Sequence, residues 1–170
     1  GLADGGLERR APAQVACVVD LLRAHGPRLI IAPHPRGRHP DHAETSALVR
    51  RAQFFCAVHG YGTAHPPVER PVLLFGLDYY PLRPSFVVDV SAELAGKLAA
   101  LRCYRSQFER APGSVATLLN DPAYLQRVET AARHYGGQIG RAAGEPFVVE
   151  GGVPVDDPVR LFGPPSEVRP

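Results

Sequence analysis

The sequence lacks several features that would narrow its class. None of its 170 residues is Met or Trp, and only 8% are aromatic. No apolar run approaches the roughly 20 residues of a transmembrane helix. The formal net charge of +2 is too small to indicate a nucleic acid or a membrane surface as the partner. The remaining composition, 45% hydrophobic and 21% charged residues, is typical of one globular domain.

The absence of Met extends to position 1, and the chain opens with GLADGG, which is typical of a turn. We therefore expect this sequence to be the C-terminal part of a longer protein. Cysteine is also scarce. Cys17, Cys56 and Cys103 lie far apart, each in a helical pattern among apolar neighbours. This arrangement predicts buried, reduced thiols and a cytoplasmic protein rather than a disulfide framework or a zinc ribbon.

Hydrophobic periodicity predicts an alternation of helices and strands. Buried strands are expected at 28–32, 72–77 and 86–90. Helices are expected over 12–25, from position 41 or 42 onward, from a Ser91 N-cap to about 104, and over 122–139. The alternation predicts an α/β fold with a Rossmann-like, largely parallel sheet flanked by helices. We expect residues 1–150 to form the domain and residues 151–170, rich in Pro and Gly, to form its C-terminal tail.

The loop after the first predicted strand holds the candidate site, because ligand sites in parallel sheets lie beyond the carboxyl ends of strands. It contains three of the seven histidines within the sequence PHPRGRHPDH. Imidazole is both a zinc ligand and a proton carrier near neutral pH. A helix that begins between His39 and His42 would bring both rings to one small volume. Asp41 could then accept a hydrogen bond from either ring and fix its tautomer.

Spacing alone leaves two interpretations of this loop open. Pro-rich loops with surface histidines often bind no metal, and a catalytic zinc site needs about three protein ligands, of which this loop offers one or two. The residues by themselves therefore predict an incomplete metal-binding or acid–base loop. Arg36 and Arg38 would add fixed positive charge at its mouth, which suits an anionic substrate group.

Several segments in this order resemble one known family. The sequence RLIIAPHPRGRHPDHAE, followed by PSFVVDVS, YRSQF and GEPF, resembles the LmbE/PIG-L-type zinc-dependent N-acetylglucosamine deacetylases. It most closely resembles those of bacillithiol biosynthesis, which act on N-acetylglucosaminyl malate and share a GLxDGGL segment with the opening GLADGGL. The resemblance runs to about position 157. It implies that residues 1–150 form a partial LmbE-like deacetylase domain.

The resemblance implies a role for each polar residue of the loop. His42 matches the family's zinc ligand, and His39 matches the histidine that stabilises the oxyanion or donates a proton to the leaving amine. Asp41 receives an orienting role in catalysis. Arg38, with Arg36 beside it, is implied to contact a substrate carboxylate.

The family's other two zinc ligands and its general base lie in an AHPDD motif, which this sequence lacks. We expect these groups upstream of Gly1, with the first strand and helix, and little or no activity from this chain alone. The implied cofactor is one divalent ion, Zn²⁺ or, in a reducing cell, iron. The implied partner is a small sugar conjugate, without nucleic acid or membrane, and relatives commonly form homo-oligomers such as hexamers.

The implied function is removal of acetate from an N-acetylglucosamine conjugate, foremost N-acetylglucosaminyl malate in bacillithiol biosynthesis. A sibling deacetylase with another conjugate, or a non-catalytic sugar- or metal-binding domain, stays open. Five residues have no defined role. His34 is expected to support the loop, and Asp89 to be either a buried, hydrogen-bonded residue or a strand-end contact to the cleft. Asp78, Tyr79 and Tyr80 either reach the site or pack a turn.

Overall fold

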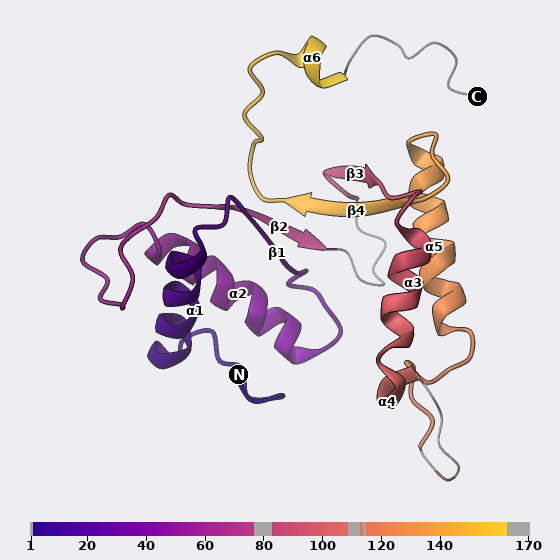
Figure 1. Cartoon of the computed structure of the whole chain (residues 1–170), viewed down its shortest axis with the longest axis horizontal. Coiled ribbons are helices and arrows are strands. Elements are labelled where there is room, and N and C mark those ends of the chain that lie inside the picture. The colour runs from indigo at the N-terminus through magenta and orange to yellow at the C-terminus, as the bar shows by residue number, and fades with distance from the viewer. Residues whose placement is uncertain (1, 77–82, 109–112, 114, 163–170) are drawn as a thin grey trace. The chain divides into compact units, whose positions relative to one another are not determined.

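The computed structural model describes residues 2–76, 83–108, 113 and 115–162. In the described part, helices and strands alternate from residue 12 to residue 76, and three helices then follow one another between the last two strands (Figure 1). The helices are α1 (Pro12–His25), α2 (Pro40–Phe55), α3 (Leu94–Arg102), α4 (Arg105–Phe108), α5 (Tyr124–Gln138) and α6 (Pro158–Phe162). The strands are β1 (Leu29–Pro33), β2 (Val72–Gly76), β3 (Phe86–Asp89) and β4 (Gly144–Val149). Within the described part, no helix combines the length and the hydropathy needed to cross a membrane.

The four strands form one sheet in the order β1-β2-β4-β3. Strands β1 and β2 are parallel, whereas β2 and β4 are antiparallel. The α/β class predicted from the sequence is thus confirmed, but the described sheet is mixed rather than largely parallel. Strand β4 lies where the sequence predicted no strand. Its sequence GEPFVV contains Gly and Pro, which weaken the pattern of a strand.

The chain divides into two compact units. Unit 1 comprises Gly1–Ser85 and Phe147–Pro154, and unit 2 comprises Phe86–Pro146 and Val155–Pro170. Strand β4 therefore contributes residues to both units. The predicted boundary at residue 150 is not tested by this division and stays a prediction.

The core of unit 1 has a helical layer and a sheet layer. Side chains at i, i+4 and i+7 of α1 pack against α2, and the cluster comprises Val15, Val19, Leu22, Leu48, Ala52 and Cys56. On the sheet, alternate residues of β1 and β2 form a second cluster, Ala32, Leu73 and Phe75. Each fully buried Val, Leu or Phe contributes about 1.5–3 kcal/mol relative to exposure. Helix α1 ends at His25 and is capped by Gly26, whose φ of 52° is left-handed.

A buried arginine ties α1 to the end of α2. Only 6% of Arg23 is exposed. Its guanidinium group donates hydrogen bonds to the Thr63 hydroxyl and to the main-chain carbonyl groups of Phe55, Cys56, Val58, Tyr61 and His65, at 2.7–3.2 Å. The last carbonyl groups of a helix lack partners within it, and a cation near them also interacts favourably with the helix dipole. Arg23 therefore ends α2 and fixes the loop that follows.

Unit 2 is built around the contact of α3 with α5. Its buried cluster is Leu94, Leu98, Ala132 and Ala143. Gly136 of α5 lies so close to the main chain of Ala143 that a Cβ atom there would be 2.5 Å from it. Glycine at 136 thus permits the close approach of α5 to the start of β4.

Asp89 lies exposed at the end of β3, so its predicted burial is wrong, whereas its predicted contact with the cleft is not tested. Its Oδ1 atom accepts hydrogen bonds from the Ser91 main-chain N–H at 3.0 Å and hydroxyl at 2.6 Å, and its Oδ2 atom pairs with Arg141 at 3.1 Å. Hydrogen bonding by Ser91 is the main cause of the lowered pKa of Asp89. The predicted N-cap at Ser91 is wrong, because this hydrogen bonding occupies Ser91 and the helix begins only at Leu94.

The three cysteines are free thiols, but only Cys56 is buried. The prediction of buried thiols is wrong for Cys17, which lies on the solvent side of α1, and for Cys103, which caps the exposed end of α3. Burial raises the pKa of the Cys56 thiol.

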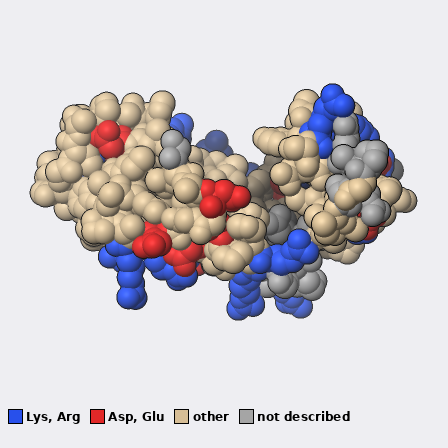
Figure 2. Space-filling model, turned by 90° about the horizontal axis from the view of Figure 1, so that it is seen from below, with Lys and Arg blue, Asp and Glu red and all other residues tan. Residues whose placement is uncertain are grey.

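On the face shown in Figure 2, side chains of both charges are scattered among other residues.

Replacing Arg23 with Met should loosen the end of α2, because the main-chain carbonyl groups it binds would lose their donor. We expect a loss of about 2–4 kcal/mol in local stability. The rate at which a thiol reagent labels Cys56, in a chain with Cys17→Ser and Cys103→Ser, measures this opening and should rise roughly 30-fold or more. Arg51→Met, at an exposed position of α2, is the control. Equal labelling rates in both variants would contradict the assigned role of Arg23.

Candidate functional site

The predicted loop joins the end of β1 to the start of α2 within unit 1. A tight turn follows β1, closed by a 2.8 Å hydrogen bond from the Gly37 N–H to the His34 carbonyl oxygen. Pro35 at the second position favours this turn. Pro40 then occupies the first position of α2, where its missing N–H group has no structural cost. The helix thus begins one or two residues earlier than the sequence predicted.

His39 is the N-cap of α2. Its extended main chain, with φ −80° and ψ 134°, turns the Nδ1 atom to accept a 3.2 Å hydrogen bond from the Asp41 N–H. An accepting Nδ1 atom is unprotonated, so the neutral ring carries its proton on Nε2. The ring is exposed. His39 therefore presents an N–H donor from a fixed position at the positive end of a helix.

Asp41 lies in the first turn of α2, with 9% of the residue exposed. Its Oδ2 atom accepts a 2.6 Å hydrogen bond from the main-chain N–H of Gly5. Gly5 adopts a φ of 70°, a conformation that favours glycine. The main-chain N–H of Asp41, rather than its carboxylate, orients the His39 ring. The carboxylate in turn holds the segment 5–9, here called the N-terminal strap.

His42 lies on the first turn of α2, half buried and near His39. The two ring centres are 5.8 Å apart, so the structure brings together the two imidazoles as the sequence predicted. Gly37 packs against the His42 ring. A Cβ atom at position 37 would lie 2.6 Å from His42 Cβ and 2.8 Å from its Nδ1 atom. Only glycine at 37 leaves room for this ring.

Sequence reasoning missed Ser46, which connects the strand to the helix. Its hydroxyl oxygen, fully buried, lies 2.6 Å from the Pro33 carbonyl oxygen and 2.7 Å from that of His42. A serine four residues after His42 can reach back along the helix in this way, so the spacing offered a weak signal. Ser46 fixes the end of β1 against the turn that carries His42.

The remaining predicted residues differ in their surroundings. The side chains of Arg36 and Arg38 are exposed. His34 is half buried, and burial, then the Arg36 charge, lowers its pKa, while Glu150 opposes this shift. Asp78, Tyr79 and Tyr80 lie outside the described residues.

The described residues do not by themselves complete a metal site. Among residues 2–76, 83–108, 113 and 115–162, no group of three or more His, Cys, Asp or Glu side chains is placed to hold an ion. The loop supplies two neighbouring imidazoles, and the nearby Asp41 carboxylate already binds the strap. A three-ligand zinc site would need further donors.

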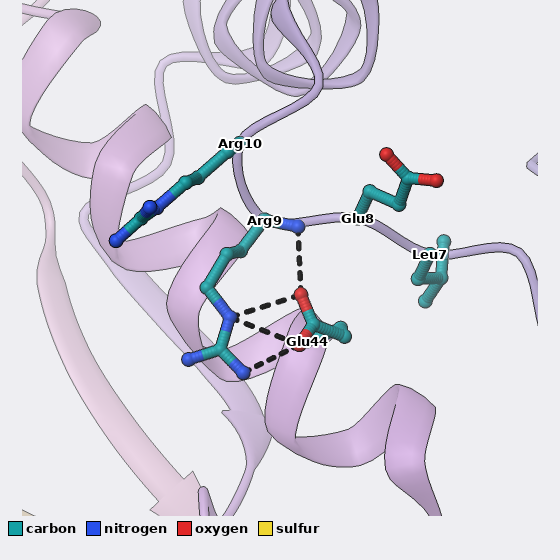
Figure 3. A pocket seen from close by; sticks show the side chains of 5 residues that line it. All are labelled: Leu7, Glu8, Arg9, Arg10 and Glu44. Carbon is teal, nitrogen blue, oxygen red and sulfur yellow. Dashed lines mark hydrogen bonds and ion pairs between the residues drawn. The ribbon is translucent and has the colours of Figure 1, made fainter.

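The N-terminal strap is also held by an ion pair, beside a shallow depression of about 450 Å³ (Figure 3). The Glu44 carboxylate accepts hydrogen bonds from the Arg9 main-chain N–H at 2.7 Å and from its guanidinium group. These bonds lower the pKa of Glu44 to about 2. The lining, Leu7, Glu8, Arg9, Arg10 and Glu44, contains no predicted site residue, so we assign the depression no part in the chemistry.

The Arg9 end of the strap should loosen at acid pH. The pKa of Glu44 is about 2 in the folded chain, against an ordinary value of 4.5. The Arg9–Glu44 pair therefore contributes its full stabilisation above pH 4.5 and loses it as the pH falls toward about 2. Glu44→Gln should therefore show less acid destabilisation over this window than the wild type, measured by hydrogen exchange of the strap amides. Glu8→Gln is the control, because it leaves the Arg9–Glu44 pair in place. An acid response of Glu44→Gln identical to that of the wild type would refute this assignment.

No family model matches the chain, but individual proteins do. A diacetylchitobiose deacetylase of Thermococcus kodakarensis is 30% identical over 103 residues, covering 54% of this chain and 36% of that protein. The chain is homologous to this deacetylase, and the match spans only about a third of the length of the deacetylase.

Solved structures share the fold. The conserved protein TT1542 from Thermus thermophilus superposes with a TM-score of 0.80 at 30% identity, covering 91% of this chain and 65% of that one. The N,N'-diacetylchitobiose deacetylase from Pyrococcus horikoshii, complexed with its inhibitor, gives 0.70 at 23% identity, covering 88% and 55%. The α/β architecture is therefore that of deacetylase structures.

Proposed function

We propose that this chain forms part of a hydrolase that removes acetate from an N-acetylglucosamine conjugate. The observation that carries the proposal is the pair of imidazoles 5.8 Å apart at the start of α2, in a chain homologous to a sugar deacetylase. Deacetylation requires a donor at the acetyl oxygen and a proton for the leaving amine. A neutral imidazole N–H held at a helix N-terminus is suited to the first of these tasks.

His39 is the proposed catalytic donor. Its Nδ1 atom is occupied by the Asp41 N–H, so Nε2–H is the group available to an acetyl oxygen. A preorganised donor at a developing oxyanion is typically worth about 3–4 kcal/mol of transition-state stabilisation. Asp41 acts through its main chain, because it fixes the ring that makes this contact.

His42 is the proposed contribution of this chain to a zinc site. The Gly37 contact fixes the position of its ring, as a metal ligand requires. A bound zinc ion would supply Lewis-acid polarisation of the acetyl carbonyl. The remaining ligands and the general base would come from polypeptide other than the described residues.

Arg36 and Arg38 bear on the substrate. Both guanidinium groups are exposed on the same loop as the imidazoles, and Arg is suited to planar recognition of carboxylates. This charge favours an acidic conjugate such as N-acetylglucosaminyl malate, and hence bacillithiol biosynthesis, over a neutral disaccharide such as diacetylchitobiose. A cytoplasmic, oligomeric enzyme completes the proposal, and the exposed free thiols of Cys17 and Cys103 suit a reducing compartment.

Acetate release from N-acetylglucosaminyl malate and from diacetylchitobiose tests the substrate, with the 170-residue chain and with the product of the complete reading frame. We expect turnover by the complete product and little by the short chain. Arg38→Ala should raise KM for the malate conjugate roughly tenfold and leave diacetylchitobiose unaffected. An equal effect on both substrates would exclude carboxylate recognition by Arg38. Binding of either sugar without acetate release would favour a non-catalytic binding domain.

The two histidines should separate by their metal content. In the active product, His42→Ala should lose zinc, measured by elemental analysis, together with turnover. His39→Ala should keep zinc and lower kcat by about 10²–10³-fold, as expected for one oxyanion donor. Loss of zinc in His39→Ala, with retention in His42→Ala, would show that the roles are exchanged.

A further inference from the structure

His34 closes the same turn twice. Its Nδ1 atom accepts a 3.1 Å hydrogen bond from the Arg36 N–H, and its carbonyl oxygen accepts one of 2.8 Å from the Gly37 N–H. The second bond is that of an ordinary four-residue turn. The first resembles the bond by which an Asn or Asp side chain caps the N–H group two residues later. Both bonds restrict the main chain between the strand and the two imidazoles.

The core of unit 1 fixes the His34 ring. The ring stands edge-on to Phe75 of β2, with centres 6.1 Å apart and planes at 78°. Phe75 is 1% exposed and belongs to the sheet cluster. Arg50 lies over the Phe75 ring and pairs with Glu150. Because the ring is anchored on a strand residue, the position of Nδ1, and with it the Arg36 amide, is set by the sheet.

Gly37, the last residue of the turn that His34 closes, packs against His42. A Cβ atom at Gly37 would lie 2.8 Å from His42 Nδ1 and 3.1 Å from the His34 carbonyl oxygen, so Gly37 fills the space between these two histidines. A change in the turn must therefore move Gly37 toward or away from the His42 ring. Packing this close transmits small displacements, because protein interiors leave few voids.

We propose that His34 is a positioning residue, which locks turn 34–37 so that Gly37 holds the His42 ring in place. Its relevance to catalysis rests on the proposed function, but the packing itself does not. The proposal requires that the side chain at position 34 carry a hydrogen-bond acceptor two bonds beyond Cβ and a group that packs against the Phe75 ring.

Two substitutions separate the acceptor from the packing. His34→Asn keeps an oxygen where Nδ1 lies and can cap the Arg36 N–H, whereas His34→Leu keeps apolar bulk and removes the acceptor. In the ¹⁵N-labelled 170-residue chain, His34→Leu should speed hydrogen exchange of the Arg36 amide at least tenfold and shift the ring resonances of His42. His34→Asn should leave both near the wild type. His59→Leu, at an exposed histidine of the same unit, is the control.

The inference is overturned if His34→Leu leaves the Arg36 amide and the His42 ring unchanged, or if His34→Asn perturbs them as strongly as Leu. Should His34→Leu fail to fold, His34→Gln replaces it, since its amide oxygen lies one bond further out and misses the Arg36 N–H. In the active product, His34→Leu should lower kcat and His34→Asn should restore it. Absence of any acetate release would defeat the proposed function and leave the NMR result to decide on His34.

Discussion

The placement of helix α2 is the constraint on which the candidate site depends. Its far end is bound by the buried guanidinium group of Arg23, and its apolar face packs on α1 and the sheet. Its first turn carries His39, Asp41 and His42. Because a helix is a stiff rod with a fixed rise per residue, holding its far end and its middle sets the direction of the first turn. A contact many residues away thus determines where the two imidazoles lie.

The start of α2 uses hydrogen bonds that serve the helix and the site at once. The first N–H groups of a helix lack partners, and a Ser or Asp N-cap side chain usually accepts from one of them. Here the imidazole of His39 does so, while Ser46 ties the helix to the last carbonyl of β1. A ring that caps a helix cannot rotate without breaking that bond. One hydrogen bond therefore both caps the helix and orients the N–H group of the His39 ring.

Local pattern explains what could be predicted from the sequence. The apolar runs of β1 and β2, the stripe on α1 and the Pro–Gly chemistry of the loop depend on neighbours within a few residues. The Arg23 contacts span 32–42 positions and the Gly5–Asp41 bond spans 36, so no local pattern reveals them. Strand β4 was missed because Gly and Pro interrupt its short apolar run. Exposure of Cys17 and Cys103 depends on which face of a helix finds a partner, and that too is a tertiary property.

The histidines of the loop are held in place whereas its arginines are exposed, and this difference has a thermodynamic reason. Pro35 and Pro40 restrict the main chain, so less conformational freedom is left to lose when a ligand binds. His34, His39 and His42 are held by hydrogen bonds or packing to this restricted backbone. The side chains of Arg36 and Arg38 extend into solvent and keep about 2 kcal/mol of rotamer entropy each. A group that must meet a transition state benefits from being fixed in advance, whereas a contact that recognises a distant carboxylate can order on binding. The loop therefore fixes the side chains proposed for chemistry and leaves those proposed for recognition adaptable.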